Sequence, residues 1–284
     1  MKKALVILVL VILLFSICAC SYVPSKRFMS RSQVNSLVNE YGTPQAVVTL
    51  SYEMKDGGVE KNFEIKLTYD LLLSQTPLAV IRFIQLANEG YYNDTLIDTY
   101  NSTYNYMIMG RYIYKDSVVS EKENDKTCYV NNALDVTFKG EFASNNYREP
   151  KDGYAQFNSF SLAMFHDEYK NEKNTNFDSA NGALILALDE ETLNSNNYAV
   201  FAHMVSMSYK SGDKPAVTMP NGGVHPQALA NLKSFTQRIN DRIVYTDTTE
   251  ETKVPSFYMM KQIVTVQVEI VGNNDWSKLP RIGK

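Results

Sequence analysis

The sequence predicts a mainly β domain that forms a sandwich or a closed barrel, and three observations indicate this class. Short apolar segments bounded by turn residues recur along the chain, whereas apolar residues at helical spacing occur in only a few places. Apolar residues make up 44% and charged residues 21% of the 284 residues, which is ordinary globular usage. A chain of this length can bury a large core. Many strands with few helices favour a sandwich or a closed barrel over a layered α/β fold.

The N-terminus predicts export followed by lipid attachment. Two lysines precede an unbroken apolar run over residues 4–15, which is shorter than the roughly 20 residues of a membrane span, so we interpret residues 1–19 as a signal peptide. Residues 17–20, Ile-Cys-Ala-Cys, resemble the lipobox of bacterial lipoproteins. This resemblance implies lipidation of Cys20 and a location on the extracytoplasmic face of the cell membrane. The alternative is an uncleaved signal anchor, which leaves the rest of the chain on the same side.

The cysteine count agrees with this interpretation. Cys18 leaves with the signal peptide and Cys20 is consumed by the lipid, so Cys128 alone remains and the mature monomer has no internal disulfide. We expect Cys128 to be structural, because no histidine lies near it in the sequence to activate its thiol.

Residues 20–45 are polar and irregular, and we expect them to form a tether that lifts the domain off the membrane. Within this stretch the sequence favours one short helix that ends at Gly42, with Pro44 beyond it. The folded domain is expected over residues 46–284.

The domain opens with a predicted β-hairpin. Residues 45–54 are rich in β-branched and aromatic side chains, and "KDGG" at 55–58 supplies turn residues. Residues 61–70 then alternate apolar and polar side chains, which predicts a strand with one buried face.

A helix is predicted after the hairpin, over residues 74–90. Thr76 can cap its N-terminus, Pro77 suits the first helical position, and Gly90 can end it. Four apolar residues share one face at helical spacing: Val80, Phe83, Ile84 and Ala87.

The later part of the chain predicts further strands. Short apolar runs separated by turn residues lie at 159–165, 182–188, 198–209 and 263–271. The last run alternates cleanly, which places its valines on one face. Residues 231–244 are compatible with a second helix.

These segments resemble the cyclophilin-type peptidyl-prolyl isomerase family in order and in local sequence. Residues 63–95, "FEIKLTYDLLLSQTPLAVIRFIQLANEGYYNDT", resemble its opening strand, first helix and following turn. Four further segments follow in the family's order: "YMIMG" (106–110), "FSLAMF" (160–165), "DSANGALILAL" (178–188) and "NNYAVFAHMV" (196–205). The resemblance implies a closed eight-stranded β-barrel capped by two helices. Two stretches are long for such a barrel and are expected to be insertions, near 112–158 and 206–260.

The resemblance also implies which positions form the site. The family's peptide-binding pocket falls at Tyr106, Met107, Met109, Ala163, Met164, Ala183, Ile185, Leu193 and Tyr198. Tyr106, Met107 and Ala163 fit the family pattern. Met109 and Ala183 stand where the family has glutamines, and Met164 stands where an asparagine is usual. Ile185 replaces a phenylalanine, Leu193 lies near the tryptophan position, and Tyr198 replaces a histidine.

The family's catalytic arginine falls at Thr99 when residues are counted from Gly90. Rotation about an Xaa-Pro amide faces a barrier of about 18–20 kcal/mol, because the C–N bond has partial double-bond character. The twisted amide leaves a lone pair on the prolyl nitrogen, and a guanidinium aimed at it stabilises the transition state selectively. Thr99 has a short, uncharged side chain, so we expect weak catalysis or none.

One residue offers a replacement for the missing cation. Met107, Met109 and Arg111 alternate along a predicted strand and therefore share a face, so Arg111 is a candidate to reach the pocket. The alternative is that Arg111 meets solvent at the barrel rim.

Other chemistry has little support. The net charge is −3 and no lysine or arginine cluster stands out, so we expect no nucleic-acid partner. "FHDE" at 165–168 could hold a metal, but one histidine beside two acids is common in loops, and we expect neither a metal nor a cofactor.

Three functions remain open at this stage. The first is a tethered isomerase that helps exported proteins to fold by acting on proline-containing or unfolded segments. The second is a noncatalytic cyclophilin-fold module that binds peptides or proteins. The third is an adhesin or solute-binding lipoprotein with an unrelated barrel.

Overall fold

The computed structural model describes residues 22–24, 27–101, 104–114, 128–130, 138–166, 182–189, 193–234, 236–238, 258–260, 264–272 and 274–283. The predicted signal peptide and the predicted lipidation site Cys20 lie outside these residues. Within them, three α-helices are α2 (Arg31–Tyr41), α3 (Pro77–Asn88) and α4 (Pro226–Ser234). Short 3-10 helices are η2 (Ala143–Asn145), η3 (Ser195–Asn197) and η4 (Trp276–Lys278).

The described strands make the structure mainly β. They are β1 (Tyr22–Pro24), β2 (Gln45–Asp56), β3 (Val59–Leu71), β4 (Thr95–Asn101), β5 (Tyr106–Tyr114), β6 (Cys128–Val130), β7 (Leu162–Met164), β8 (Leu184–Ala187), β9 (Val200–Ser211), β10 (Val217–Pro220), β11 (Thr236–Arg238), β12 (Tyr258–Met260), β13 (Thr265–Val271) and β14 (Arg281–Gly283). The strands predicted near 159–165, 182–188, 198–209 and 263–271 correspond to β7, β8, β9 and β13.

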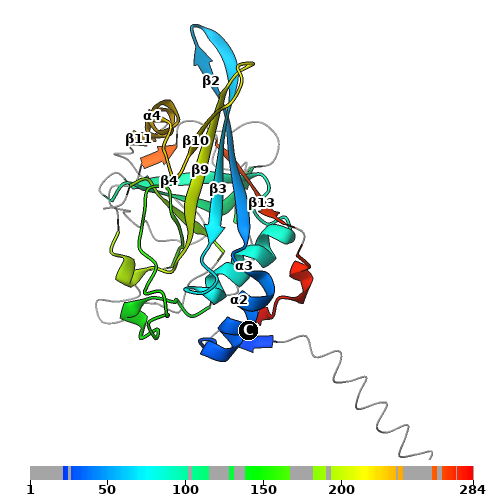
Figure 1. The fold of residues 1–284 in the computed structure, drawn as a ribbon. Coiled ribbons are helices and arrows are strands. Elements are labelled where there is room, and N and C mark those ends of the chain that lie inside the picture. The colour runs from blue at the N-terminus through cyan, green and yellow to red at the C-terminus, as the bar shows by residue number, and fades with distance from the viewer. Residues whose placement is uncertain are drawn as a thin grey trace, which may run out of the picture.

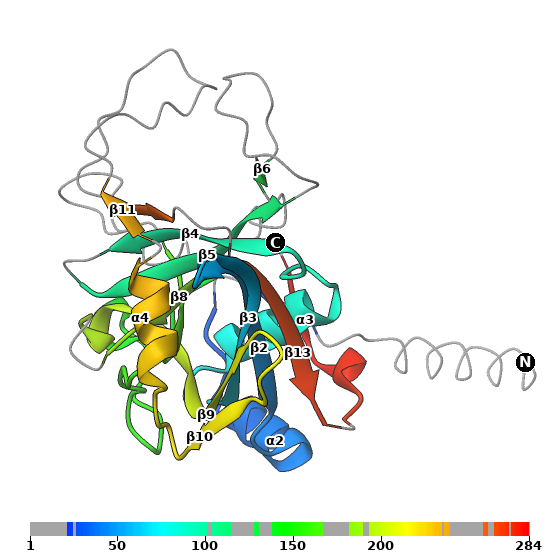
Figure 2. The same ribbon diagram turned by 90° about the horizontal axis from the view of Figure 1, so that it is seen from above.

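Eight of these strands close on themselves, which confirms the predicted barrel. The order β4-β13-β2-β3-β9-β7-β8-β5 returns to β4, because β4 also pairs with β5. All these pairings are antiparallel. Closure leaves no free edge within the ring. Figure 2 looks down on this arrangement, with β2, β3 and β13 on one side of the ring and β4, β5 and β8 on another.

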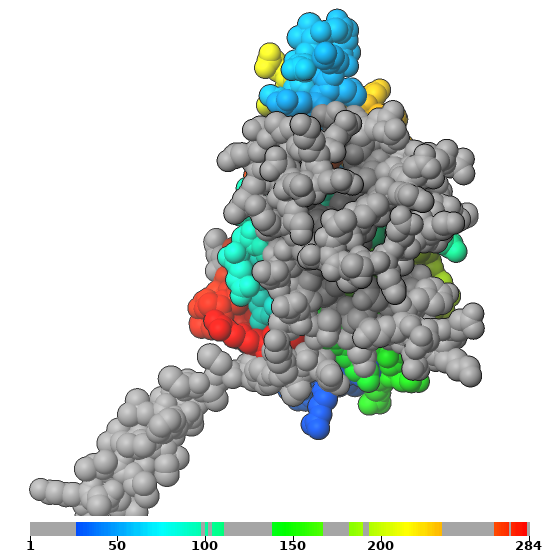
Figure 3. All heavy atoms as spheres, turned by 180° about the vertical axis from the view of Figure 1, so that it is seen from behind, coloured from blue at the N-terminus to red at the C-terminus, as the bar shows by residue number. Residues whose placement is uncertain are grey.

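The opening hairpin is built as its sequence predicts. β2 pairs with β3 from Gln45 opposite Asp70 to Asp56 opposite Val59. Gly57 and Gly58 form the two-residue turn with φ of 62° and 85°, and glycine adopts these positive values without steric cost. The hairpin is longer than the barrel requires, so its tip projects from one end of the molecule (Figures 1 and 3).

Helix α3 is almost wholly buried and lies at the opposite end from that tip (Figure 1). Pro77 occupies its first turn as predicted, but Thr76 makes no capping hydrogen bond, because its hydroxyl donates to the Val200 carbonyl at 3.1 Å. The Glu141 carboxylate instead accepts from the Ala79 N–H at 3.1 Å. A residue distant in the sequence therefore satisfies the helix N-terminus.

The predicted tether is partly packed against the domain. Helix α2 ends at Gly42 as expected, and Ser30 forms a capping box with Gln33 at its start. Leu37 and Tyr41 are nevertheless buried in the main core, and Tyr41 stacks on Trp276 at 5.4 Å. Helix α2 is therefore part of the folded domain.

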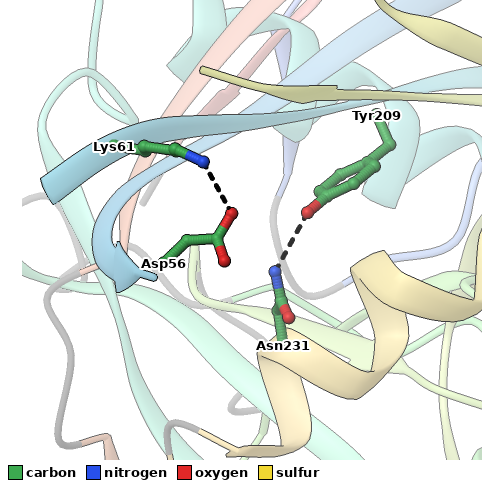
Figure 4. A network of polar contacts seen from close by, with 4 residues as sticks. All are labelled: Asp56, Lys61, Tyr209 and Asn231. Carbon is green, nitrogen blue, oxygen red and sulfur yellow. Dashed lines mark hydrogen bonds and ion pairs between the residues drawn. The ribbon is translucent and has the colours of Figure 1, made fainter. Parts of the chain in front are cut away.

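Helix α4 begins earlier than the helix expected at 231–244. It spans Pro226–Ser234, and the chain re-enters a strand at Thr236. The buried amide of Asn231 donates to the Tyr52 hydroxyl at 2.9 Å and to the Tyr209 hydroxyl at 3.1 Å. Figure 4 shows Asn231 reaching from α4 to Tyr209 on β9, with the Asp56–Lys61 ion pair of the hairpin beside them. These bonds fasten α4 to the hairpin end of the barrel.

The C-terminal segment returns to the N-terminal one. β14 pairs in parallel with β1, with Arg281 opposite Tyr22. Gln85 of α3 donates to the Pro280 carbonyl at 2.9 Å, which holds this ribbon beside α3. In the described part of the chain, no helix is both long and apolar enough to cross a membrane.

Candidate functional site

Strands β7 and β8 divide their side chains between two apolar clusters. Leu162, Met164, Leu184 and Leu186 belong to the large core that includes α3 and the other barrel strands. Ala163, Ile185 and Ala187, which alternate with them, belong to a separate smaller cluster. Since successive side chains of a strand point to opposite faces, the smaller cluster lies on the outside of the barrel wall.

We call this group the outer apolar cluster. Its buried members are Ala155, Phe157, Ala163, Ile185, Ala187, Tyr198 and Val200, and partly buried Leu72, Tyr106, Phe165 and Leu193 pack against them. All eleven side chains are uncharged. The cluster is therefore apolar throughout and offers no ion pair, and its seven buried members are each at most 7% exposed.

The strand register places the centre of the cluster. Ala163 of β7 lies opposite Ile185 of β8 on one side and Val200 of β9 on the other. Tyr106 of β5 lies opposite Ala187 of β8. Four adjacent strands therefore contribute apolar side chains to the outer face, on two neighbouring rows of the register.

Loop residues complete one side of the cluster. The Phe157 N–H donates to the Ser195 hydroxyl at 3.0 Å, which ties the loop before β7 to η3. The Phe157 ring meets the Tyr198 ring edge-on at 5.9 Å between centroids. Such an aromatic pair fixes both rings relative to each other.

The β4–β5 turn fixes the opposite side, where Tyr106 lies. Asn105 adopts a left-handed conformation with φ of 51°, which asparagine tolerates well. Its amide donates to the Asp189 carboxylate and accepts from the Tyr100 hydroxyl at 2.9 Å. Its carbonyl accepts from the Leu188 N–H at 3.0 Å. Asn105 thus joins the turn to the end of β8, next to Tyr106.

The structure brings five of the predicted pocket residues together in the outer apolar cluster: Tyr106, Ala163, Ile185, Leu193 and Tyr198. Three others, Met107, Met109 and Met164, are fully buried in the large core on the inner face. Ala183 is also fully buried, and its carbonyl accepts from the Phe165 N–H at 2.9 Å. The functional roles of all nine residues stay predictions.

The two candidate catalytic positions lie on β4 and β5. Thr99 is opposite Ile108 in the register. From Ile97 opposite Met109 to Thr95 opposite Ile113, β5 advances two residues more than β4 does. Gly110, whose φ is 89°, lies in this bulge. The side chains of Thr99 and Arg111 lie outside the described part, so the replacement role of Arg111 stays a prediction.

Several members of the cluster were not predicted. Ala187 and Val200 follow from the alternation of β8 and β9 once Ile185 and Tyr198 are assigned. Ala155 and Phe157 fall in a stretch that we expected to be an insertion. They have no periodic pattern, so no local signal in the sequence could have found them.

The comparisons with known proteins identify the family. The model of "Cyclophilin type peptidyl-prolyl cis-trans isomerase/CLD" matches residues 59–210, which is more than half of the chain. The chain therefore belongs to the cyclophilin-type peptidyl-prolyl cis-trans isomerase family. Among curated proteins, none matches the sequence significantly.

Three solved structures illustrate how distant the relatives are. A cyclophilin-type peptidyl-prolyl cis-trans isomerase from Cryptosporidium parvum is 13% identical, with 81% of this chain and 99% of that chain covered and a TM-score of 0.38. The Mimivirus cyclophilin is 14% identical, with coverages of 80% and 91% and a TM-score of 0.32. A cyclophilin from Hirschia baltica is 12% identical, with coverages of 85% and 99% and a TM-score of 0.29.

Proposed function

We propose that the protein binds proline-containing segments of exported polypeptides at the outer apolar cluster and assists their folding, with weak isomerase activity. One observation carries this proposal. Five residues that the family pattern assigns to the peptide pocket come from three strands and the segment before β9, and they meet in one cluster. Family membership supplies the class of substrate, a peptide with an Xaa-Pro bond.

An apolar cluster can bind a prolyl ring and still be a poor catalyst. Removing water from the amide favours the twisted state a little, because that state is less polar than the planar ones. The larger contribution comes from a donor placed at the prolyl nitrogen, and loss of such a donor costs about 10²–10³ in rate. With threonine at position 99, this contribution is missing, and the proposed activity is weak for that reason.

The proposed location is the extracytoplasmic face of the cell membrane, with lipidated Cys20 as the anchor. The lipobox-like sequence at 17–20 supports it. The pairing of β1 with β14 supports a short link, because β1 begins two residues after Cys20. In this arrangement the α3 end of the barrel is nearer the membrane than the β2–β3 tip.

The proposal is tested by adding the purified domain to a short peptide with one Xaa-Pro bond. We expect the peptide signals in NMR spectra to shift with protein concentration, and cis–trans exchange to be accelerated about 10²–10³ less than by an active cyclophilin used as the control. A peptide that neither binds nor exchanges faster would contradict the proposal. Acceleration equal to the control would contradict the assignment of Thr99.

The second candidate is a noncatalytic binding module. The uncharged character of all members of the outer apolar cluster favours it, because none of them can stabilise the prolyl lone pair as a cation would. The same titration separates the two. Binding with no change in the exchange rate selects the noncatalytic module, whereas binding with measurable acceleration selects the weak isomerase.

A further inference from the structure

His166 is a buried histidine in contact with the outer apolar cluster. It follows β7 by two residues and is 2% exposed. Its ring stacks on Phe142 at 5.4 Å between centroids, with an interplanar angle of 24°. It also contacts the Tyr198 ring at 5.0 Å between centroids, with an interplanar angle of 32°. Since Tyr198 belongs to the outer apolar cluster, His166 packs against a member of that cluster.

The same histidine also holds the backbone next to Tyr198. His166 Nε2 lies 2.8 Å from the Asn197 carbonyl oxygen, and because a carbonyl only accepts, Nε2 carries the hydrogen. Asn197 is the last residue of η3, and its side chain accepts from the Ser144 hydroxyl at 2.7 Å. The residue before Tyr198 is therefore fixed through both its backbone and its side chain.

Tyr198 has no regular structure of its own to fix it. It lies between η3 and β9 in an extended conformation, with φ of −134° and ψ of 143°. Its ring is held by aromatic neighbours on two sides, Phe157 at 5.9 Å and His166 at 5.0 Å. The Tyr198 side chain is 5% exposed, so the position of its ring depends on the residues that pack against it.

We propose that His166 is a positioning residue. It sets the orientation of Tyr198 in the outer apolar cluster and thereby the affinity of the domain for a proline-containing peptide. This inference rests on the proposed function. His166 does so in two ways, by a ring contact that supports the Tyr198 side chain and by a hydrogen bond that fixes the preceding carbonyl. Phe142, which is 1% exposed, stacks on the imidazole and restricts its movement.

This role differs from the metal site considered for "FHDE" in the sequence. Nε2 of His166 bonds to the Asn197 carbonyl, and the two acids of that site, Asp167 and Glu168, lie outside the described residues. Among the residues that the structure describes, no group of three or more histidine, cysteine or acidic side chains converges to hold a metal ion.

Three variants separate the two contributions. His166→Phe keeps the ring but loses the donor, His166→Gln keeps a donor but loses the ring, and His166→Ala loses both. We expect His166→Ala to weaken peptide affinity about tenfold, and the other two to weaken it by less. The Tyr198 ring signals, assigned by comparison with Tyr198→Phe, should shift in all three variants in the absence of peptide.

His225 provides the matched control. Its ring contacts Tyr209 at 4.6 Å, so it also packs on a tyrosine, but near the far end of β9 and beside α4. His225→Ala should leave both the Tyr198 signals and the peptide affinity unchanged, even if it lowers the melting temperature as much as His166→Ala does.

The outcomes distinguish the inference from the proposed function. If the wild-type domain binds no peptide, the proposed function fails, while the Tyr198 signals still report whether His166 sets that ring. If the wild-type domain binds peptide but His166→Ala changes neither affinity nor the Tyr198 signals, the positioning role is wrong. An equal loss of affinity in His225→Ala would also overturn it, since the effect would then be one of general stability.

Discussion

Thr99 is the residue on which the expected weakness of catalysis depends. It lies on β4 at the position that the family pattern assigns to arginine, and β4 and β5 are paired there. A threonine hydroxyl is too short and carries no charge to stabilise the prolyl lone pair. The deficit is therefore chemical, and a single side chain could restore the missing group.

We predict that Thr99→Arg raises the rate of prolyl isomerisation by at least tenfold over the wild type, because a guanidinium near the prolyl nitrogen stabilises the twisted amide selectively. The rate is measured by NMR exchange on a short Xaa-Pro peptide. Thr99→Leu is the control, since it changes size without adding charge. A rate for Thr99→Arg no higher than that for Thr99→Leu would show that position 99 does not face the bound peptide.

Glu141 is the clearest buried ionisable group away from the cluster. It is 2% exposed and accepts a hydrogen bond from Ala79 at the start of α3. Burial raises the pKa of the Glu141 carboxyl from about 4.5 to about 8, against the opposing effect of the α3 backbone N–H groups. The folded state then binds a proton that the unfolded state releases between pH 4.5 and 8, so this group's contribution to stability is lost as pH rises through that window.

Glu141→Gln removes this titration while preserving a capping oxygen. We predict that the free energy of unfolding of this variant, relative to the wild type, increases by about 2 to 4 kcal/mol between pH 5 and pH 8. Denaturant unfolding at the two pH values measures it, and other titrating groups cancel in the difference. A difference that does not change with pH would mean that Glu141 is ionised throughout.

At the scale of elements, β8 contributes side chains both to the large core and to the proposed binding cluster. Its residues alternate between the large core and the outer apolar cluster over Leu184–Ala187, and all of them are buried. Ile185 and Leu186 are neighbours of similar size whose side chains point to opposite faces of β8, Ile185 into the outer apolar cluster and Leu186 into the large core. They therefore form a matched pair for substitution.

We predict that Leu186→Ala lowers the free energy of unfolding by about 2–5 kcal/mol, because it leaves a cavity in the barrel core. Ile185→Ala should lower stability by a similar amount, because Ile185 is also buried, but should weaken peptide binding several-fold more than Leu186→Ala does. Denaturant unfolding and peptide titration of both variants check this. Equal loss of peptide affinity in the two would contradict the assignment of the outer face as the binding face.

The elements also show what the sequence could predict. The β2–β3 hairpin and α3 follow from local signals, namely glycines at the turn and Pro77 at the helix start. The cap of α3 was missed, because Thr76 bonds to Val200 and the cap comes from Glu141, far along the chain. Helix α4 was predicted too late, since its anchor is a tertiary contact of Asn231 rather than an apolar face.

The site, like the elements, was predictable only in part. Tyr106, Ala163, Ile185, Leu193 and Tyr198 could be placed from the family pattern, and they lie together in the cluster. The family pattern also assigned Met107, Met109 and Met164 to the pocket, but they lie in the large core. Strand alternation, counted from Tyr106, Ala163 and Ile185, gives this inner face, whereas the family pattern alone does not. Phe157 and the His166 contacts depend on how loops fold over the barrel, which local sequence does not encode.

At the scale of the whole molecule, the two described ends of the chain lie together. β1 and β14 pair beside α3, whereas the β2–β3 tip lies at the other end (Figure 1). A lipid on Cys20 would attach the α3 end to the membrane. The barrel wall that carries the outer apolar cluster would then remain open to polypeptides outside the cell membrane.

We predict that Cys20→Ser releases the protein from this anchor, because no thiol remains for the lipid. Wild-type protein expressed with its full N-terminus should fractionate with membranes and partition into detergent. The variant should lose the lipid, as measured by mass spectrometry of the N-terminal peptide. A wild-type protein without lipid would contradict the lipobox assignment and would leave the barrel and its cluster unaffected.

The central claim is that a proline-containing peptide binds on the outer face of β7, β8 and β9. NMR spectra of the labelled domain during titration with a short Xaa-Pro peptide test it most directly. We predict that signals of Ala163, Ile185 and Tyr198 shift and saturate together, whereas those of Leu186 and Val59 at the hairpin tip stay in place. Saturable shifts at the tip or elsewhere, with Ile185 and Tyr198 unchanged, would contradict the claim.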